Sequence, residues 1–233
     1  ASSTTYTTGV AVMKACQELR KKICELGAQM IEVDQDKVDF DGSYVFCDGE
    51  DEEKRVSLEQ VALEGTFFNN IELQVVKQHS SPLSPPPFMV GMAEVEVDTE
   101  TGTVEVLDYV AAVDCGTPIN PNLARVQTEA GIAQGIGMAL FEDVQYTDKG
   151  KIRSNSFMQY KIPTRMDMGN LHVEFESSYE PTGPFGAKSI GEIVINTPAP
   201  ALTHAIANAT GLWFRELPIT SEQIAMGIME NEN

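Results

Sequence analysis

Apolar residues recur every three or four positions near the start of the chain, at Val12, Cys16, Leu19, Ile23 and Leu26. This spacing predicts one face of a helix, and Gly27 is expected to end it. The hydroxyl-rich run 2–8 comes directly before this helix. Its side chains and the free N–H groups of the first turn would form a site for a phosphate or another polar cofactor group. A plain N-cap with spare Ser and Thr residues explains the same pattern equally well.

Alternation of apolar and polar residues replaces the helical period further along and predicts two hairpins. In the first, residues 30–47 alternate around Asp41-Gly42, a dipeptide typical of hairpin turns, and a charged turn over 48–55 follows. In the second, which has the clearest pattern in the chain, residues 89–97 and 104–113 alternate on either side of a turn.

Two shorter segments, 141–146 and 171–175, are expected to be further strands. The outer face of the second hairpin carries three carboxylates, Glu94, Glu96 and Asp98. Evenly spaced carboxylates suggest a metal site, but every second residue of a strand that faces water has the same spacing. We therefore interpret these side chains as a solvated face.

Capping residues mark the remaining helices. A short helix is expected over 57–65, and Asn120-Pro121 predicts the start of a longer one by the order of cap and proline. Thr197 is expected to cap a helix that Gly211 stops, and Ser221 to cap a last short helix. Three glycines give the longer helix a thin side, against which another element is expected to pack: Gly131, Gly135 and Gly137.

A proline-rich connection over 80–87 lies between the two hairpins, and neither a helix nor a central strand continues through such a segment. We place a subdomain boundary there, which divides the chain into residues 1–80 and residues 81–233. The hairpins and helices together predict an α+β fold of two subdomains, with mixed or antiparallel sheets and packed helices.

Composition narrows the class of protein. With 42% hydrophobic and 22% charged residues among 233, the chain resembles an ordinary globular protein. A net charge of -19 argues against nucleic acid as a partner, because that affinity comes mainly from Lys and Arg. No apolar run is long enough to span a bilayer and no signal-peptide pattern is present, so no membrane partner and a cytoplasmic location are expected. The chain opens on Ala1 rather than Met, which favours a processed or dissected piece of something longer.

The four cysteines, Cys16, Cys24, Cys47 and Cys115, form no C-x-x-C pair. By themselves they offer neither an iron-sulfur nor a zinc ligand set, and reduced thiols are the default expectation.

One glycine-rich stretch presents a single acid: Gly183-Pro184-Phe185-Gly186-Ala187-Lys188-Ser189-Ile190-Gly191-Glu192. Its small residues let the backbone approach a ligand closely, and the helix expected after Thr197 holds the loop from behind. Glu192 is therefore either a solvated side chain on a structural turn or a fixed acid or base. Gln127 has a hydrogen-bond donor and an acceptor on one side chain and is the best candidate for hydrogen bonds to the edge of a heterocycle. A glutamine that simply faces solvent is nevertheless the commoner case.

Three stretches taken together resemble the molybdenum hydroxylases, the xanthine dehydrogenase and aldehyde oxidase family. They are the hydroxyl run 1–9, the segment Asp114-Cys115-Gly116-Thr117-Pro118-Ile119-Asn120-Pro121 with Gln127 and Gly131, and the stretch 183–192. Their order and separation agree with that family, and the resemblance covers essentially the whole chain. It implies the C-terminal half of a molybdopterin-binding subunit or domain, of the nicotinate- or purine-hydroxylase type.

The resemblance also implies residue roles. Glu192 matches the family's catalytic glutamate, a general base. The other implied positions contact the pterin cofactor, through side chains of the hydroxyl run and a glutamine and through main-chain groups of the loop: Ser2, Thr4, Thr5, Gln127, Lys188, Ser189, Ile190 and Gly191. The chain would supply no metal ligand, because the pterin dithiolene holds the molybdenum. Ile193-Val194 stand where the family often has Pro-Pro, which bears on the substrate more than on the chemistry.

Cofactors and partners follow from the same resemblance. The expected cofactor is molybdopterin, as such or as the cytosine dinucleotide, with molybdenum, while iron-sulfur clusters and FAD are expected on partner chains. The expected partners are an N-terminal molybdopterin half or subunit, an iron-sulfur subunit and an FAD subunit. The implied reaction inserts water-derived oxygen at an electron-poor carbon of an N-heteroaromatic small molecule such as a purine or nicotinate.

Three alternatives stay open: an aldehyde-oxidising member of the family, a non-catalytic molybdopterin-binding or assembly fragment, and a small-ligand domain unrelated to molybdenum.

Overall fold

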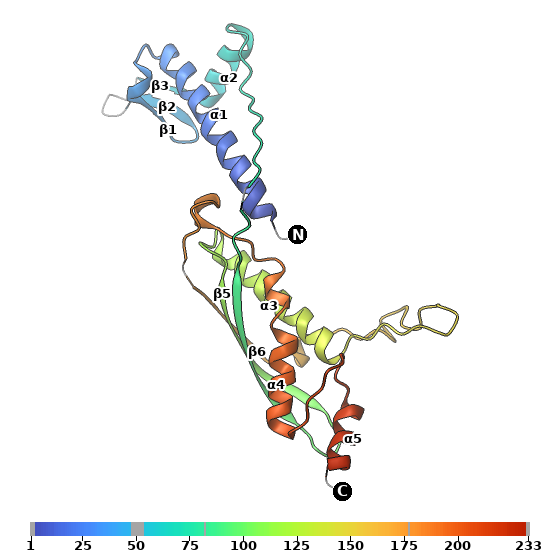
Figure 1. Ribbon diagram of the computed structural model, residues 1–233. Helices are drawn as coiled ribbons and strands as arrows, with labels where there is room; N and C mark the ends of the chain where they lie inside the picture. The colour runs from blue at the N-terminus through green and yellow to red at the C-terminus, as the bar shows by residue number, and fades with distance from the viewer. Residues whose placement is uncertain (1–2, 48–53, 82, 177, 232–233) are drawn as a thin grey trace. The chain divides into compact units, whose positions relative to one another are not determined.

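The computed structural model describes residues 3–47, 54–81, 83–176 and 178–231 (Figure 1). The chain divides into two compact units, each with its own sheet and buried core. The smaller unit is Thr7–Pro82, and the larger consists of Ala1–Tyr6 together with Leu83–Asn233. The change of unit at residue 82 lies in the proline-rich connection. The expected subdomain 1–80 differs from the smaller unit chiefly by its first six residues, which belong to the larger unit.

The smaller unit combines two helices with an antiparallel sheet of order β1-β2-β3. Its helices and strands are α1 (Gly9–Met30), β1 (Val38–Phe40), β2 (Tyr44–Cys47), β3 (Arg55–Ser57) and α2 (Leu58–Phe67). Their buried core consists of Ile23, Leu26, Val45, Val56 and Val61. Of the hairpin predicted over 30–47, the part from Val38 onwards is confirmed as β1 and β2, whereas the residues before it are not a strand but the end of α1, a turn and the 3₁₀ helix Gln35–Lys37. Strand β3 was not predicted, and most of the expected charged turn, residues 48–53, lies outside the described residues.

Helix α1 runs through Gly27 to Met30, so the predicted end at Gly27 is wrong. The reason is packing: Gly27 is buried against β2, and a Cβ at this position would lie 2.7 Å from the side chain of Val45. The glycine lets the helix approach the sheet closely instead of stopping it.

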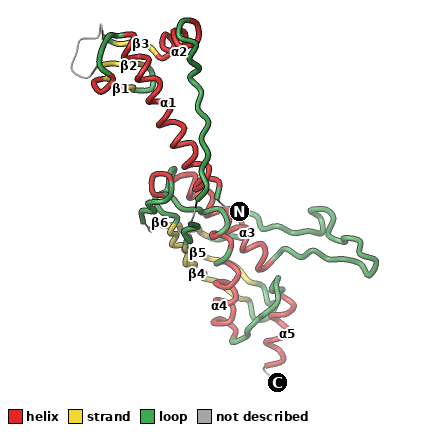
Figure 2. The backbone as a smooth tube through the Cα atoms, turned by 45° about the horizontal axis from the view of Figure 1, so that its top comes forward, coloured by secondary structure: helices red, strands yellow, loops and turns green. Residues whose placement is uncertain are grey.

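The larger unit is a three-stranded mixed sheet with helices on one face (Figures 1 and 2). Its main elements are β4 (Phe88–Val97), β5 (Val104–Asp114), α3 (Pro121–Leu140), β6 (Asn170–Phe175), α4 (Pro198–Thr210) and α5 (Ser221–Asn231). β4 and β5 form the predicted hairpin, and β6 pairs with β5 in parallel. Tyr109, Val113, Ile132, Ile136 and Leu202 lie in the core between the sheet and the helices. The predicted α+β class is confirmed.

Residues 141–146 do not form the predicted strand. They belong to an extended arm that leaves the end of α3, and both views show it projecting from the larger unit (Figures 1 and 2). Tyr146 and Ile152 form an isolated bridge across the turn of this arm. Apolar and polar residues therefore alternate in this segment as they do in a strand, although the segment lacks the neighbouring strands that make a sheet.

Two helix starts differ from the predicted caps. Thr197 has helical backbone angles, and its hydroxyl shares a hydrogen bond of 2.8 Å with the hydroxyl of Tyr109 on β5. At α5 the cap is Thr220 rather than Ser221, because the Gln223 N–H donates to the Thr220 hydroxyl at 3.2 Å. The stop of α4 at Gly211, which has φ 76°, is confirmed.

Glu94 and Glu96 lie on the exposed face of β4, as a solvated face requires. Among the residues that the structure describes, no cluster of His, Cys, Asp and Glu side chains is suited to a metal ion. Within the same ranges, no helix has the length and apolar character needed to cross a membrane.

Candidate functional site

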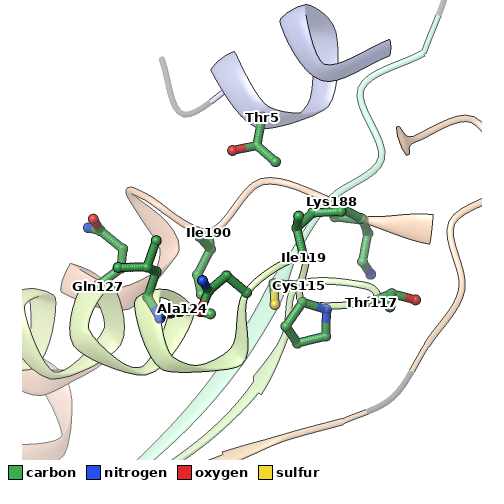
Figure 3. A pocket seen from close by; sticks show the side chains of 12 residues that line it. Thr5, Cys115, Thr117, Ile119, Ala124, Gln127, Lys188 and Ile190 are labelled. Atoms are coloured by element: carbon green, nitrogen blue, oxygen red, sulfur yellow. Dashed lines mark hydrogen bonds between the residues drawn. The ribbon is translucent and has the colours of Figure 1, made fainter. Parts of the chain in front are cut away.

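A cavity of about 330 Å³ lies in the larger unit, beside the first turns of α3 (Figure 3). Three parts of the chain that are far apart in the sequence line it: Thr5, the segment from Cys115 to Gln127, and the loop from Ala187 to Ile190. Figure 3 shows Thr5 across the hollow from Gln127 and Ala124 of α3, with Ile190 near these two side chains and Lys188 on the other side, near Ile119. The three stretches singled out in the sequence therefore meet at one place.

The start of α3 faces this cavity. Asn120 caps the helix because its Oδ1 accepts the N–H of Leu123 at 3.1 Å, and Pro121 occupies the first helical position. Asn120, Leu123 and Ala124 all line the cavity. The positive end of the helix dipole is thus directed at a hollow in which negative charge is favoured.

The loop that follows Gly183 is held by main-chain hydrogen bonds to the segment after β5. The N–H of Thr117 donates to the Gly186 carbonyl at 2.8 Å, and the N–H of Lys188 donates to the Cys115 carbonyl at 2.7 Å. Gly116 permits this pairing, because a Cβ there would lie 2.3 Å from the Gly186 carbonyl oxygen. The chain reverses at Phe185 and Gly186, whose φ angles are 52° and 86°. The loop is therefore a fixed wall of the cavity.

The side chain of Lys188 is buried and paired. Its ammonium group donates to Asp114 Oδ2 at 2.6 Å and to the Pro86 carbonyl at 3.3 Å. The other oxygen of Asp114 accepts the Gly116 N–H at 3.0 Å and the Ser178 hydroxyl at 2.5 Å. Burial alone would raise the pKa of Asp114, but the hydrogen bonds from Lys188, Ser178 and Gly116 outweigh it and hold this pKa below its usual range. The sequence predicted neither this pair nor the role of Asp114 within it.

Gln127 and the end of the loop are in contact. The Gln127 side-chain amide donates to the Gly191 carbonyl at 3.3 Å, which joins α3 to the residue before Glu192. The Glu192 side chain is exposed, and the residue immediately precedes the short 3₁₀ turn Ile193–Ile195. In the described part of the chain, Ser189, Gly191 and Glu192 lie beside the cavity rather than among the residues that line it.

The hydroxyl run is helical from Thr4 onwards, because Thr4–Thr8 form a π-helical turn that leads into α1. The expectation of a side-chain cap just before the helix is therefore wrong. Thr5 lines the cavity, whereas Thr4 is exposed outside the lining found in the described chain, and Ser2 lies outside the described residues. The hydroxyl of Tyr6 shares a hydrogen bond of 2.6 Å with that of Thr182, which ties the run to the loop of the larger unit.

Cys115 lines the floor of the cavity and is buried. Burial raises the pKa of its thiol, so the sulfur is a neutral, weakly polar group at physiological pH. A cavity with an apolar floor, hydroxyl and amide groups on its walls and a helix N-terminus beside it fits a flat heterocycle that carries an anionic substituent. Molybdopterin, a pterin with a phosphate group, has this chemistry.

Residues 1–169 match the sequence profile of the molybdopterin cofactor-binding domain, and the chain belongs to this family. It is a molybdopterin-binding part of the molybdenum hydroxylases, as the resemblance in the sequence implied. The chain is 33% identical over 228 residues to the probable hypoxanthine oxidase XdhD of Escherichia coli K12, a match that covers 96% of this chain and 23% of the relative.

Two further likenesses agree. The gamma subunit of the 6-hydroxypseudooxynicotine dehydrogenase complex of Paenarthrobacter nicotinovorans is 32% identical, with 96% of this chain and 29% of the subunit covered. The crystal structure of quinoline 2-oxidoreductase from Pseudomonas putida 86 superposes with a TM-score of 0.82 at 26% identity, over 99% of this chain and 30% of that one. The chain therefore spans less than a third of the length of each of these three proteins.

Proposed function

We propose that this chain forms one wall of the molybdopterin site of a molybdenum hydroxylase that oxidises an electron-poor carbon of an N-heteroaromatic substrate. The observation that carries the proposal is the cavity in which Thr5, Gln127 and the loop 187–190 meet, with Glu192 two residues beyond Ile190. The names of the three proteins described above refer to hypoxanthine, to a pyridine compound and to quinoline, which supports the substrate class.

The residues that would hold the cofactor come from both sides of the cavity. Thr5 and Gln127 offer a hydroxyl and an amide, and the loop 188–191 offers main-chain groups. Ser2 and Thr4 belong to the same run and are proposed contacts near the metal-binding end. When bound, the cofactor supplies molybdenum, which accepts electrons from the substrate while oxygen is taken from water. The cytosine dinucleotide form is proposed as the second possible version of the cofactor.

Glu192 is the proposed general base. Glu192 follows Gly191, whose carbonyl accepts a hydrogen bond from Gln127, so α3 holds the backbone that presents this acid. Its role would be to take a proton at Oε1 or Oε2 from the water-derived nucleophile. General-base assistance of this kind contributes on the order of 10²–10⁴-fold to a rate.

Glu192 is exposed in this chain, and we propose that further polypeptide covers it in the working enzyme. A base that takes part in such chemistry works in a site from which bulk water is excluded. We propose that the first molybdopterin half supplies this cover, and that partner subunits with iron-sulfur clusters and FAD carry the electrons away.

The test is Glu192→Gln in the complete enzyme. The amide keeps the shape of the side chain but cannot accept the proton, so kcat is expected to fall by about 10²–10⁴-fold while the molybdenum and pterin contents stay unchanged. Glu94→Gln, on the exposed face of β4, is the matched control and should leave kcat unaltered. Near wild-type turnover of Glu192→Gln would show that the catalytic assignment is wrong.

A further inference from the structure

Lys188 lines the cavity with a side chain that is both charged and buried. Its side chain is 8% exposed and that of Asp114 is 22% exposed, so both charges have lost most of their water. Removing ions from water costs several kcal/mol for each charge, and an apolar pair of similar size often gives equal or greater stability. A general need for stability therefore gives no particular reason for a charged pair here.

The pair does something that an apolar contact could not do, because it joins several segments at fixed points. Asp114 ends β5 and accepts hydrogen bonds from Lys188, from Ser178 after β6, and from the Gly116 N–H. The ammonium of Lys188 also donates to the Pro86 carbonyl just before β4. Lys188 is thus connected directly to the end of β5 and to the segment before β4, and through Asp114 to the segment after β6.

Residue 188 is also anchored through its main chain, since its N–H donates to the Cys115 carbonyl at 2.7 Å. A residue held at both its backbone and its side chain has little freedom to rotate. The next three residues lead to Gly191, where Gln127 holds the chain again. The segment 188–191 is therefore fixed at both ends, and Glu192 follows directly.

We propose that Lys188 and Asp114 are positioning residues: their ion pair sets the orientation of the loop 188–191 against the cofactor and the direction in which Glu192 is presented. The inference rests on the proposed function, because it assumes that the loop faces the cofactor. The Lys188 ammonium and the Asp114 carboxylate act through the loop backbone and need touch neither cofactor nor substrate. Residues that orient the ligands of a metal ion typically change metal affinity or activity by about 10–100-fold when removed, and we expect an effect of the same order here.

The decisive variant is the double replacement Asp114→Asn/Lys188→Met in the complete enzyme. It removes both charges together, so no uncompensated charge stays buried, as it would in either single variant. We expect a cooperatively folded enzyme whose dissociation constant for the pterin cofactor is raised by about 10–100-fold and whose kcat per bound molybdenum atom is lowered. Expressing kcat per molybdenum separates misplacement of Glu192 from simple loss of cofactor.

Asp108→Asn is the matched control, because it breaks the exposed pair between Asp108 and His172 on the same sheet. It should change neither the pterin dissociation constant nor kcat per molybdenum. If the double variant folds and matches the wild type in both quantities, the pair has only a structural role and the proposal is overturned.

Should the double variant not fold, Lys188→Gln decides. It removes the ion pair, while the Asp114 carboxylate keeps its hydrogen bonds from Ser178 and the Gly116 N–H, so weaker pterin binding is expected and unchanged binding and kcat would overturn the proposal. Comparison with Glu192→Gln distinguishes a failure of this proposal from a failure of the proposed function. If Glu192→Gln is inactive while the double variant is fully active, only the positioning role of the ion pair is refuted. If Glu192→Gln is active, the general-base role of Glu192 is refuted.

Discussion

At the scale of single residues, Asp114 shows how one side chain determines a local structure. It stands in an Asp-Cys-Gly sequence that gives no sign of burial, yet its two oxygens accept hydrogen bonds from three other residues. Those partners are 2, 64 and 74 positions away along the chain. Local sequence patterns carry no information at separations of 64 and 74, so the contacts of Asp114 with Ser178 and Lys188 could be found only in the folded structure.

The lowered pKa of Asp114 leads to a prediction about pH. A carboxyl group whose pKa is lower in the folded state adds stability above its unfolded pKa, about 3.9, and loses it as the pH falls through the folded pKa. Asp114→Asn leaves the Lys188 charge buried without its partner, so at pH 7 we expect a loss of about 3 kcal/mol, the lower end for a broken buried pair. The difference between wild type and variant should shrink below about pH 4.

Urea unfolding of the chain at several pH values measures this difference. Asp108→Asn, which removes an exposed carboxylate on the same strand, should cost less than about 1 kcal/mol. If Asp114→Asn lowers the free energy of unfolding equally at pH 7 and at pH 3, the lowered pKa of Asp114 is contradicted.

At the scale of secondary structure, α3 connects the cavity with the elements behind Glu192. The thin side predicted from its glycines is confirmed for two of the three: a Cβ at Gly131 would lie 2.3 Å from Val194, and one at Gly135 would lie 2.6 Å from Pro198, whereas Gly137 faces Glu142 and Pro163 instead. The helix therefore packs closely against the 3₁₀ turn that follows Glu192 and against the start of α4. A change at this contact would move the turn and the acid together.

Gly131→Val tests the contact. The added side chain overpacks the contact with Val194, which costs about 1–3 kcal/mol, and displaces the turn that follows Glu192. We expect lower stability in thermal or urea unfolding and, in the complete enzyme, a lower kcat. Ala130→Val on the exposed side of the same helix is the control and should cost less than about 1 kcal/mol, because it changes only helix propensity. Equal stabilities of the two variants would show that the close approach is not needed.

At the scale of the whole molecule, the predictable parts are those with local signals. The β4–β5 hairpin, the start of α3 at Asn120 and the stop of α4 at Gly211 each depend on a turn or a cap that a few residues specify. The parallel pairing of β6 with β5 and the contact of Tyr6 with Thr182 depend on distant parts of the chain, and the sequence indicated neither.

The candidate site likewise has some features that the sequence indicated and others that it did not. Its three stretches were found by resemblance, and Thr5, Gln127, Lys188 and Ile190 do line one cavity. The strand predicted over 141–146 was wrong because alternation records only local polarity, and the structure has the segment in an arm outside the sheet. The roles of the individual side chains toward the cofactor stay predictions.

The last prediction concerns how much of the cofactor site this chain can build. Glu192 is exposed and the cavity is formed by one unit, while the chain covers 23% of XdhD and 29% of the P. nicotinovorans subunit. A ligand pocket generally buries 70–90% of its ligand, and we expect this cavity, with Glu192 exposed outside it, to bury less. We therefore expect the chain purified alone to contain neither molybdenum nor pterin, and both to appear after co-expression with the remaining molybdopterin half.

Metal analysis and pterin fluorescence measure the molybdenum and pterin contents. Glu192→Gln is the control, because this variant should still bind the cofactor. Absence of both even with the partner would refute the shared site, and full loading of the isolated chain would show that it builds the whole site alone.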